Sequence, residues 1–392
     1  WLKPLVSNDS RHAAQSFLRC AWRIMKEGKK GTYYPPFPVL GLASDGQGVF
    51  MSCGGGGEKA AKEVPNVVQA HRYDESTGTM STIASLDTVK SVVVFLSYGK
   101  ALDLWLGSVS GGSRAFQLSV ENNSITQLCE WTTETEGKGP SQNVVRLSPS
   151  GHLVATGGTD GRVKIFEASK LQVEPVLKHD CAKNDEVLDL DFSADNKTLA
   201  SCDRTGSCRL WDPSSGQQLK VIDYKYSGAA VSVRVLRYLP PAENSPQLLL
   251  AAMSAPRGPA CIALYNNDGN IVKEKKLDQS PLTAMELDHS AQQVCVNFVT
   301  GGKRIYSIPA MRCLKKVENV HELPAPCAAF VGNTAVSGSG DRSINLLTCK
   351  KGGSSGGGTS CLYLLFLIFI TMVVTFFLLR IGIKSTMLSG EL

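Results

Sequence analysis

Four consecutive glycines, Gly54–Gly57, form the most unusual short segment of this 392-residue chain. They follow a strand-like run, Gly48–Met51, and a second strand-like run begins at Val67. Glycine adopts backbone angles that other residues avoid and lets a main chain approach a ligand closely, but each glycine loses much conformational entropy on folding. Two interpretations are open. The segment is either a flexible hairpin tip or a shaped loop whose carbonyls and amides bind an ion or a partner.

The sequence offers no motif for covalent chemistry. The glycine run is not a phosphate-binding loop, because Lys59 is followed by Ala60 where that motif requires serine or threonine. His179 and Asp180 resemble a catalytic pair only because they are adjacent, and we expect a structural histidine there. Aspartates in turns usually bond their own backbone, and this is the role we expect for Asp160, Asp203 and Asp341.

The elements that position the glycine run are strands that repeat. The runs Val144–Glu167 and Val187–Asp212 share a strand, a turn and a hairpin, and Phe166 and Trp211 within them are 45 residues apart. This is the period of a propeller blade, and Trp211-Asp212 is the dipeptide for which WD repeats are named.

Weaker copies of the repeat extend in both directions. Comparable strand ends fall at residues 68, 116, 166, 211, 265, 306 and 347. The sequence therefore predicts an all-β fold, a seven-bladed WD-repeat β-propeller over residues 37–349, whose core is supplied by blades stacked around a ring. In this fold the glycine run joins two strands of the first blade and projects from one face.

The carboxyl end breaks the soluble pattern. Cys361–Leu379 contains nineteen residues without a charge, enough to cross a bilayer core of about 30 Å. We predict a Gly/Ser tether at 350–360, a transmembrane helix at 361–383 and a short lumenal tail at 384–392. A single span near this end leaves the propeller in the cytosol, and its short length suits the endoplasmic reticulum membrane.

The amino-terminal segment, 1–36, is a basic extension in which Ser10–Lys30 could form a helix. That helix could bind a membrane surface or a partner, or the segment could be a poorly ordered or packed extension. The net charge of +6 is mild for this length and argues against nucleic acid as a partner.

A degenerate WD-repeat propeller with four glycines in its first blade and a carboxyl-terminal anchor resembles one family. This family comprises the membrane exchange factors of the endoplasmic reticulum that start COPII coat assembly, the Sec-twelve type. The resemblance covers 37–383. It implies a guanine-nucleotide exchange factor that promotes GDP release and GTP loading on a small Sar-type GTPase. Such a protein performs no covalent chemistry and binds no nucleotide itself. Its implied partners are the GTPase, the COPII machinery and, through a single span, the membrane.

The resemblance also assigns roles within the loop. In the family, backbone carbonyls and an asparagine side chain hold a potassium ion, and Asn66 matches that asparagine. Val64 matches the aliphatic residue ahead of it, so Val64, Pro65 and Asn66 are the implied exchange residues. The implied GTPase contacts are Gly54, Gly55, Gly56, Gly57, Glu58 and Lys62. Lys59 and Lys62 make this loop more basic than the family pattern, which opposes a bound cation. The alternative function is a membrane-anchored scaffold that recruits coat or cargo proteins without exchange activity.

Overall fold

The computed structural model describes residues 31–349, except 59–62, 134–140, 170, 172–175, 182–184, 223–224, 227–228, 241–248, 255–257 and 267. The chain divides into two compact units, residues 1–349 and 350–392. The predicted tether, transmembrane helix and tail, and residues 1–30, lie outside the described residues. Within the described part no helix has both the length and the apolar character needed to cross a bilayer.

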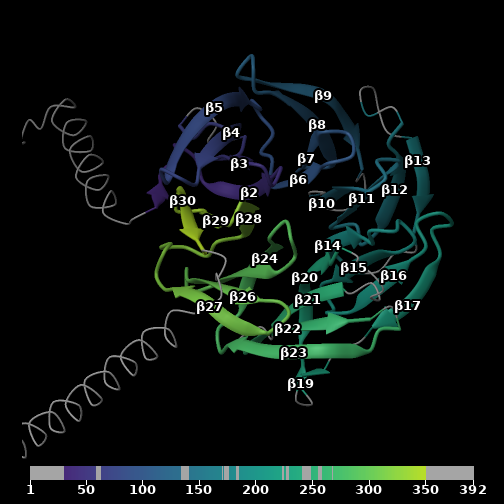
Figure 1. The fold of residues 1–392 in the computed structure, drawn as a ribbon. Helices are drawn as coiled ribbons and strands as arrows, with labels where there is room; N and C mark the ends of the chain where they lie inside the picture. Colours follow the sequence, from purple (N-terminus) through teal and green to yellow (C-terminus); the bar gives the residue numbers. More distant parts are fainter. Residues whose placement is uncertain are drawn as a thin grey trace, which may run out of the picture. The chain divides into compact units, whose positions relative to one another are not determined.

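Seven antiparallel sheets of four strands each surround a common axis (Figure 1). Blades 1 to 3 contain β2 (Val39–Ser44), β3 (Val49–Gly54), β4 (Val67–Asp74) and β5 (Thr79–Asp87); β6 (Phe95–Gly99), β7 (Leu104–Val109), β8 (Gly112–Ser119) and β9 (Ser124–Thr132); and β10 (Gln142–Leu147), β11 (Leu153–Gly158), β12 (Val163–Glu167) and β13 (Val176–Asp180).

Blades 4 to 6 follow in the same order. They contain β14 (Val187–Phe192), β15 (Leu199–Asp203), β16 (Cys208–Trp211) and β17 (Gln218–Ile222); β20 (Ser232–Tyr238), β21 (Leu249–Ser254), β22 (Ala260–Tyr265) and β23 (Ile271–Asp278); and β24 (Leu282–Leu287), β25 (Gln293–Phe298), β26 (Lys303–Ser307) and β27 (Arg312–Val317). A small two-stranded sheet, β18 (Lys225–Tyr226) with β19 (Ala229–Ala230), separates blades 4 and 5 along the chain.

The seventh blade closes the ring. Its three carboxyl-terminal strands are β28 (Cys327–Val331), β29 (Thr334–Ser339) and β30 (Ser343–Thr348), and its outermost strand is β1 (Thr32–Tyr33). The pairs Thr32 with Asn345 and Tyr33 with Ile344 therefore join the two ends of the propeller. Thr32 and Tyr33 thus belong to the propeller, although its predicted start was residue 37. The two-residue strand precedes a proline-rich run and has no periodic pattern of its own.

The seven strand ends marked by the sequence all lie in equivalent strands. Residues 68, 116, 166, 211, 265, 306 and 347 belong to β4, β8, β12, β16, β22, β26 and β30, each the third strand of its blade. The predicted seven-bladed propeller is thus confirmed for the described part of the chain. The regular spacing of these strands remains visible where the repeats are weak. This spacing, rather than the WD dipeptide, was therefore the basis of the prediction.

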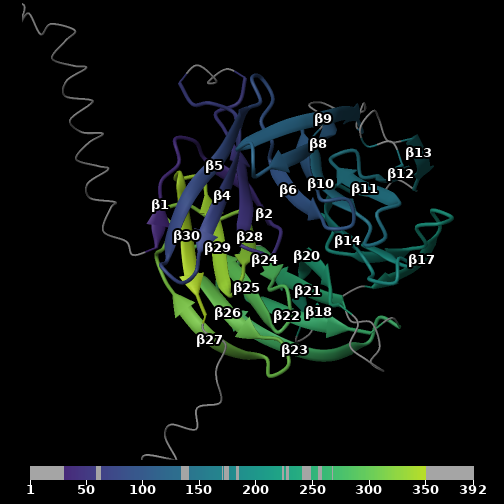
Figure 2. The same ribbon diagram turned by 45° about the horizontal axis from the view of Figure 1, so that its top comes forward.

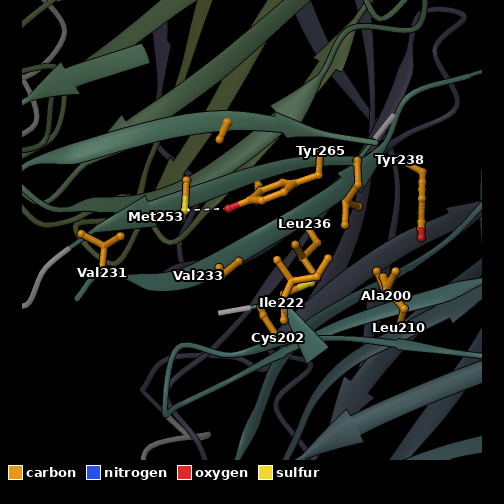
Figure 3. Close-up of a cluster of buried hydrophobic side chains, with 14 of the residues drawn as sticks. Ala200, Cys202, Leu210, Ile222, Val231, Val233, Leu236, Tyr238, Met253 and Tyr265 are labelled. Carbon is orange, nitrogen blue, oxygen red and sulfur yellow. Dashed lines mark hydrogen bonds between the residues drawn. The ribbon is translucent and has the colours of Figure 1, made fainter. Parts of the chain in front are cut away.

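Apolar side chains fill the spaces between neighbouring blades. One cluster takes Ala200, Cys202, Leu210 and Ile222 from blade 4 and Leu236, Met253 and Tyr265 from blade 5, and Figure 3 shows them facing one another. The Tyr265 hydroxyl donates a hydrogen bond to the Met253 sulfur at 3.7 Å. Since each cluster needs two blades, no single blade buries its apolar faces alone.

Lys303 is a fully buried cation at the junction of blades 6 and 7. Its Nζ donates hydrogen bonds to the carbonyls of Ala335 (3.3 Å) and Asn345 (2.8 Å) and to Ser337 Oγ (3.1 Å). These three partners are neutral. Burial lowers the pKa of Lys303 to about 7, far below the ordinary 10.5.

This lysine makes stability depend on pH. Between about pH 7 and 10.5 the unfolded chain binds more protons at this position than the folded one, so stability rises with pH over that window. In Lys303→Met the free energy of unfolding should rise less steeply with pH, by up to about 1.4 kcal/mol per pH unit. This change in slope is expected even if the substitution also shifts stability by a constant amount at every pH. Urea unfolding at pH 7 and pH 9 measures both slopes, with the exposed Lys197→Met as control. Equal slopes for the wild type and Lys303→Met would contradict the prediction.

Candidate functional site

The glycine run lies in the connection between the second and third strands of blade 1. Gly54 ends β3, and Asn66 immediately precedes β4. The predicted place of the loop in the first blade is therefore confirmed. Figure 2 shows the described ends of this connection extending beyond the strands of blade 1. Lys62 falls in the undescribed segment 59–62.

Two of the glycines are required by close contacts. A Cβ atom on Gly54 would lie 1.8 Å from the carbonyl oxygen of Pro38, and one on Gly55 would lie 2.2 Å from Asn66 Oδ1. Gly57 has φ of +82° with open space around it, so it needs glycine for its backbone angle alone. The first two positions thus accept no side chain unless the backbone moves.

Asn66 holds the loop from inside. It is fully buried, and its Oδ1 accepts a hydrogen bond from the Gly57 N–H at 3.0 Å. Its Nδ2 donates to the Val89 carbonyl at 2.8 Å, and its own carbonyl accepts the Thr88 N–H at 2.8 Å. Asn66 therefore ties the glycine run to the connection between β5 and β6. For the described residues of the connection, these bonds favour a shaped loop over a flexible hairpin tip.

Val64 and Pro65 are half-buried and do not form an exposed tip. Val64 packs against the apolar cluster that includes Phe37 and Val39, and its carbonyl accepts the Gly56 N–H at 3.4 Å. Gly56 and Glu58 are exposed. The structure therefore brings Gly55, Gly57 and Asn66 together, keeps Val64 partly in the core and leaves Gly56 and Glu58 accessible.

The site contains one residue that the sequence did not reveal. Val89, in the connection between β5 and β6, is 66% exposed and has φ of +58°. Its position beside the glycine loop depends on the hydrogen bond from Asn66. No turn motif marks Val89, and a contact between connections 23 residues apart is not visible in a local pattern.

The loop offers neutral oxygens for a cation. Asn66 Oδ1 accepts one hydrogen bond from protein, from the Gly57 N–H, and has a second lone pair. A monovalent cation prefers such amide and carbonyl oxygens, so these residues fit potassium in chemical type. Among the residues that the structure describes, no group of three or more His, Cys, Asp or Glu side chains could hold a metal ion.

A buried serine–histidine pair lies in the same blade but is structural. Ser52 Oγ is 2.8 Å from His71 Nε2, and His71 Nδ1 is 3.1 Å from Thr82 Oγ1. Both Ser52 and His71 are fully buried, and burial lowers the pKa of His71 to about 4. A substrate cannot reach this serine, and the third group is a hydroxyl rather than a carboxylate. The network connects three strands of blade 1.

The other titratable residues singled out in the sequence also hold the fold. His179 Nε2 donates to the Ser214 carbonyl at 2.7 Å. Two of the turn aspartates bond the backbone of their own turn as expected: Asp160 accepts from the Arg162 N–H and Asp203 from the Thr205 N–H. Asp341 instead accepts from the Glu322 N–H, 19 residues away.

Comparison with known proteins supports this architecture. The family described as "WD domain, G-beta repeat" matches residues 131–167 and 174–212. Two chains from solved structures, "COPII on membranes, outer coat vertex" and "The structure of the COPII coat assembled on membranes", superpose with a TM-score of 0.67 at 14% identity. Each match covers 81% of this chain, and 85% and 47% of the respective solved chains. At this identity the superpositions show the fold alone.

Two curated proteins share sequence with the chain. SEC12-like protein 1 of Arabidopsis thaliana is 29% identical over 113 residues, which are 29% of this chain and 27% of that protein. Telomerase protein component 1 of Rattus norvegicus is 25% identical over 209 residues, 52% of this chain and 7% of that protein. The chain thus spans well under two thirds of the length of either relative.

The fold and the matched repeats define the class: the protein is a seven-bladed β-propeller with WD repeats at residues 131–167 and 174–212. Its sequence is similar to SEC12-like protein 1 over 113 residues, and the structural matches agree with the propeller fold.

Proposed function

We propose that this propeller is a guanine-nucleotide exchange factor for a small Sar-type GTPase and acts in COPII coat assembly. The observation that carries the proposal is the glycine loop held in one shape by Asn66, in a propeller similar to SEC12-like protein 1. The two solved chains that superpose on this propeller come from COPII coats, which agrees with this setting, although those matches concern the fold.

Exchange requires no proton transfer by the factor. It requires that the factor bind the nucleotide-free GTPase more tightly than the loaded one. A loop fixed before binding loses little conformational freedom in the complex, so its contacts can act on the GTPase. The exposed Gly56 and Glu58 provide that contact surface, whereas Val64 and Asn66 keep the loop in its shape.

Potassium is part of the proposal. The residues that would hold it are Asn66, through Oδ1, and the carbonyls of the glycine run. A potassium ion bound there would attract these oxygens and so would stiffen the loop. Asn66 itself orients the run through the Gly57 N–H and anchors it through the Val89 carbonyl.

We also propose that residues 361–383 anchor the protein in the endoplasmic reticulum membrane, with the propeller in the cytosol and 384–392 in the lumen. Anchoring would raise the effective concentration of a GTPase that docks on the same membrane. Protease added to sealed microsomes should then digest the propeller, and full protection of the propeller would refute this topology.

Release of labelled GDP from the purified GTPase, measured with the full-length chain, tests the exchange activity. The wild-type chain should accelerate release. Asn66→Ala should reduce the acceleration by roughly 5- to 150-fold, the usual range of coupling between sites, because Gly57 and Val89 lose their common partner. Part of the wild-type rate should depend on potassium when it is replaced by a larger organic cation.

Val64→Thr is the matched test of the apolar position, because it replaces one methyl group of valine by a hydroxyl at nearly the same volume. Val64→Asp would place a carboxylate against the apolar cluster and lower the melting temperature, which would obscure the result. Wild-type rates in both Asn66→Ala and Val64→Thr would show that the loop is not the active element. A wild-type chain that binds the GTPase without releasing GDP would support the scaffold function instead.

A further inference from the structure

The connection between β5 and β6 contains a valine in a conformation that valine rarely adopts. Val89 has φ of +58°, where a β-branched side chain crowds its own backbone. Eight non-glycine residues of the described part have positive φ, and Val89 is the β-branched one among them. Strained residues of this kind persist where the surroundings determine the backbone, and they gather at functional sites.

Hydrogen bonds from two directions impose this conformation. The Val89 N–H donates to Asp87 Oδ1 at 2.7 Å, and the Val89 carbonyl accepts from Asn66 Nδ2 at 2.8 Å. Immediately before Val89, the Thr88 N–H donates to the Asn66 carbonyl at 2.8 Å and Thr88 Oγ1 donates to the Ser91 carbonyl at 2.7 Å. The backbone of Val89 is thus fixed by the same buried asparagine that fixes the glycine loop.

Packing does not explain why the residue is a valine. Two thirds of Val89 is exposed, so an apolar side chain there contributes little to the core. Asparagine or glycine would make the same backbone hydrogen bonds with less strain, because both tolerate left-handed angles. The strained conformation and the exposed apolar side chain both favour a role outside the fold.

We propose that Val89 is a second partner-contacting residue, an apolar anchor beside the glycine loop that packs against an apolar patch on the bound GTPase. This inference rests on the proposed function. Asn66 links the glycine run to Val89, because its side chain hydrogen-bonds the Gly57 N–H and the Val89 carbonyl. The surface therefore presents two points at a fixed separation, and exchange depends on both.

Two variants separate contact from folding. Val89→Asn and Val89→Gly both keep the backbone hydrogen bonds and relieve the strain, so the melting temperature should stay equal or rise. Release of labelled GDP from the GTPase should nevertheless fall roughly five- to thirty-fold in both variants, as for a buried anchor at an interface. Val299→Asn is the matched control: this valine is 42% exposed and follows the second strand of blade 6. It should exchange at the wild-type rate.

The outcomes are distinct. An active wild-type chain with both Val89 variants equally active would overturn this inference and leave the proposed function standing. A wild-type chain that fails to accelerate release would overturn the proposed function, and this inference with it. Melting temperatures that fall in parallel with activity in both Val89 variants would show a structural role for Val89 and would also overturn the inference.

Discussion

Gly55→Ala should abolish accelerated nucleotide release and lower the stability of the propeller by about 1–3 kcal/mol, the usual effect of inserting atoms into a filled space. The new methyl group would lie 2.2 Å from Asn66 Oδ1 and 2.7 Å from Asn66 Cα. One of the two residues must therefore move, and the Gly57 and Val89 hydrogen bonds depend on where Asn66 lies. Urea unfolding and GDP release measure the two effects separately.

Gly78→Ala is the control for backbone strain. Gly78 follows β4 in the same blade, has φ of +70° and has no atom within 4 Å of an added Cβ. This variant should lose about 1–2 kcal/mol through the left-handed angle alone and keep its exchange activity. If Gly55→Ala exchanges nucleotide as well as Gly78→Ala does, the shape of the loop does not determine activity.

Arg237→Ala should be the most damaging substitution for the ring itself. Arg237, in β20, donates to Asp189 of β14 at 2.6 Å and to Glu286 of β24 at 2.9 and 3.0 Å, so it joins blades 4, 5 and 6 at their innermost strands. Only 7% of Arg237 is exposed. Removing it takes away the cation that hydrogen-bonds both carboxylates, while Arg146 stays 3.7 Å from Asp189, so the loss should be about 3 kcal/mol.

The pH dependence of stability provides a second test of Arg237→Ala. Burial raises the pKa of Glu286, but the charges of Arg237 and Arg146 and the hydrogen bonds to the carboxylate together hold the pKa below its ordinary value. Without Arg237 that carboxyl should take up its proton at higher pH. The stability deficit of Arg237→Ala should therefore shrink as pH falls, because protonation removes the unpaired charge. Arg204→Ala, which breaks an exposed ion pair with Glu186, should change stability by less than about 1 kcal/mol. Equal losses for the two variants would contradict this account of the network.

The architecture could be predicted because it repeats. Seven strand ends at near-regular spacing gave seven blades even where the WD dipeptide was absent, since the period is a property of the whole blade. The strand that closes the ring was missed because Thr32–Tyr33 is two residues long and pairs with a strand more than 300 residues away. A local pattern contains no signal for such a contact.

The site was only partly visible in the sequence. The glycine run stood out by residue type, and its contacts explain that choice at Gly54 and Gly55. Val64, which the resemblance implies as an exchange residue, packs partly against the apolar cluster of blades 1 and 7. Val89 was missed because its strain and its bond to Asn66 arise only when two connections of the folded blade meet.

The most direct test of the central claim is the affinity of the full-length chain for the Sar-type GTPase, measured with and without saturating GDP and magnesium. An exchange factor must bind the nucleotide-free form more tightly, because the binding of the factor and of the nucleotide oppose each other reciprocally. We expect the affinity to fall by roughly 100-fold or more when GDP is added, and this difference to disappear in Gly55→Ala. Equal affinities for the two forms in the wild-type chain would contradict the exchange function and identify a scaffold.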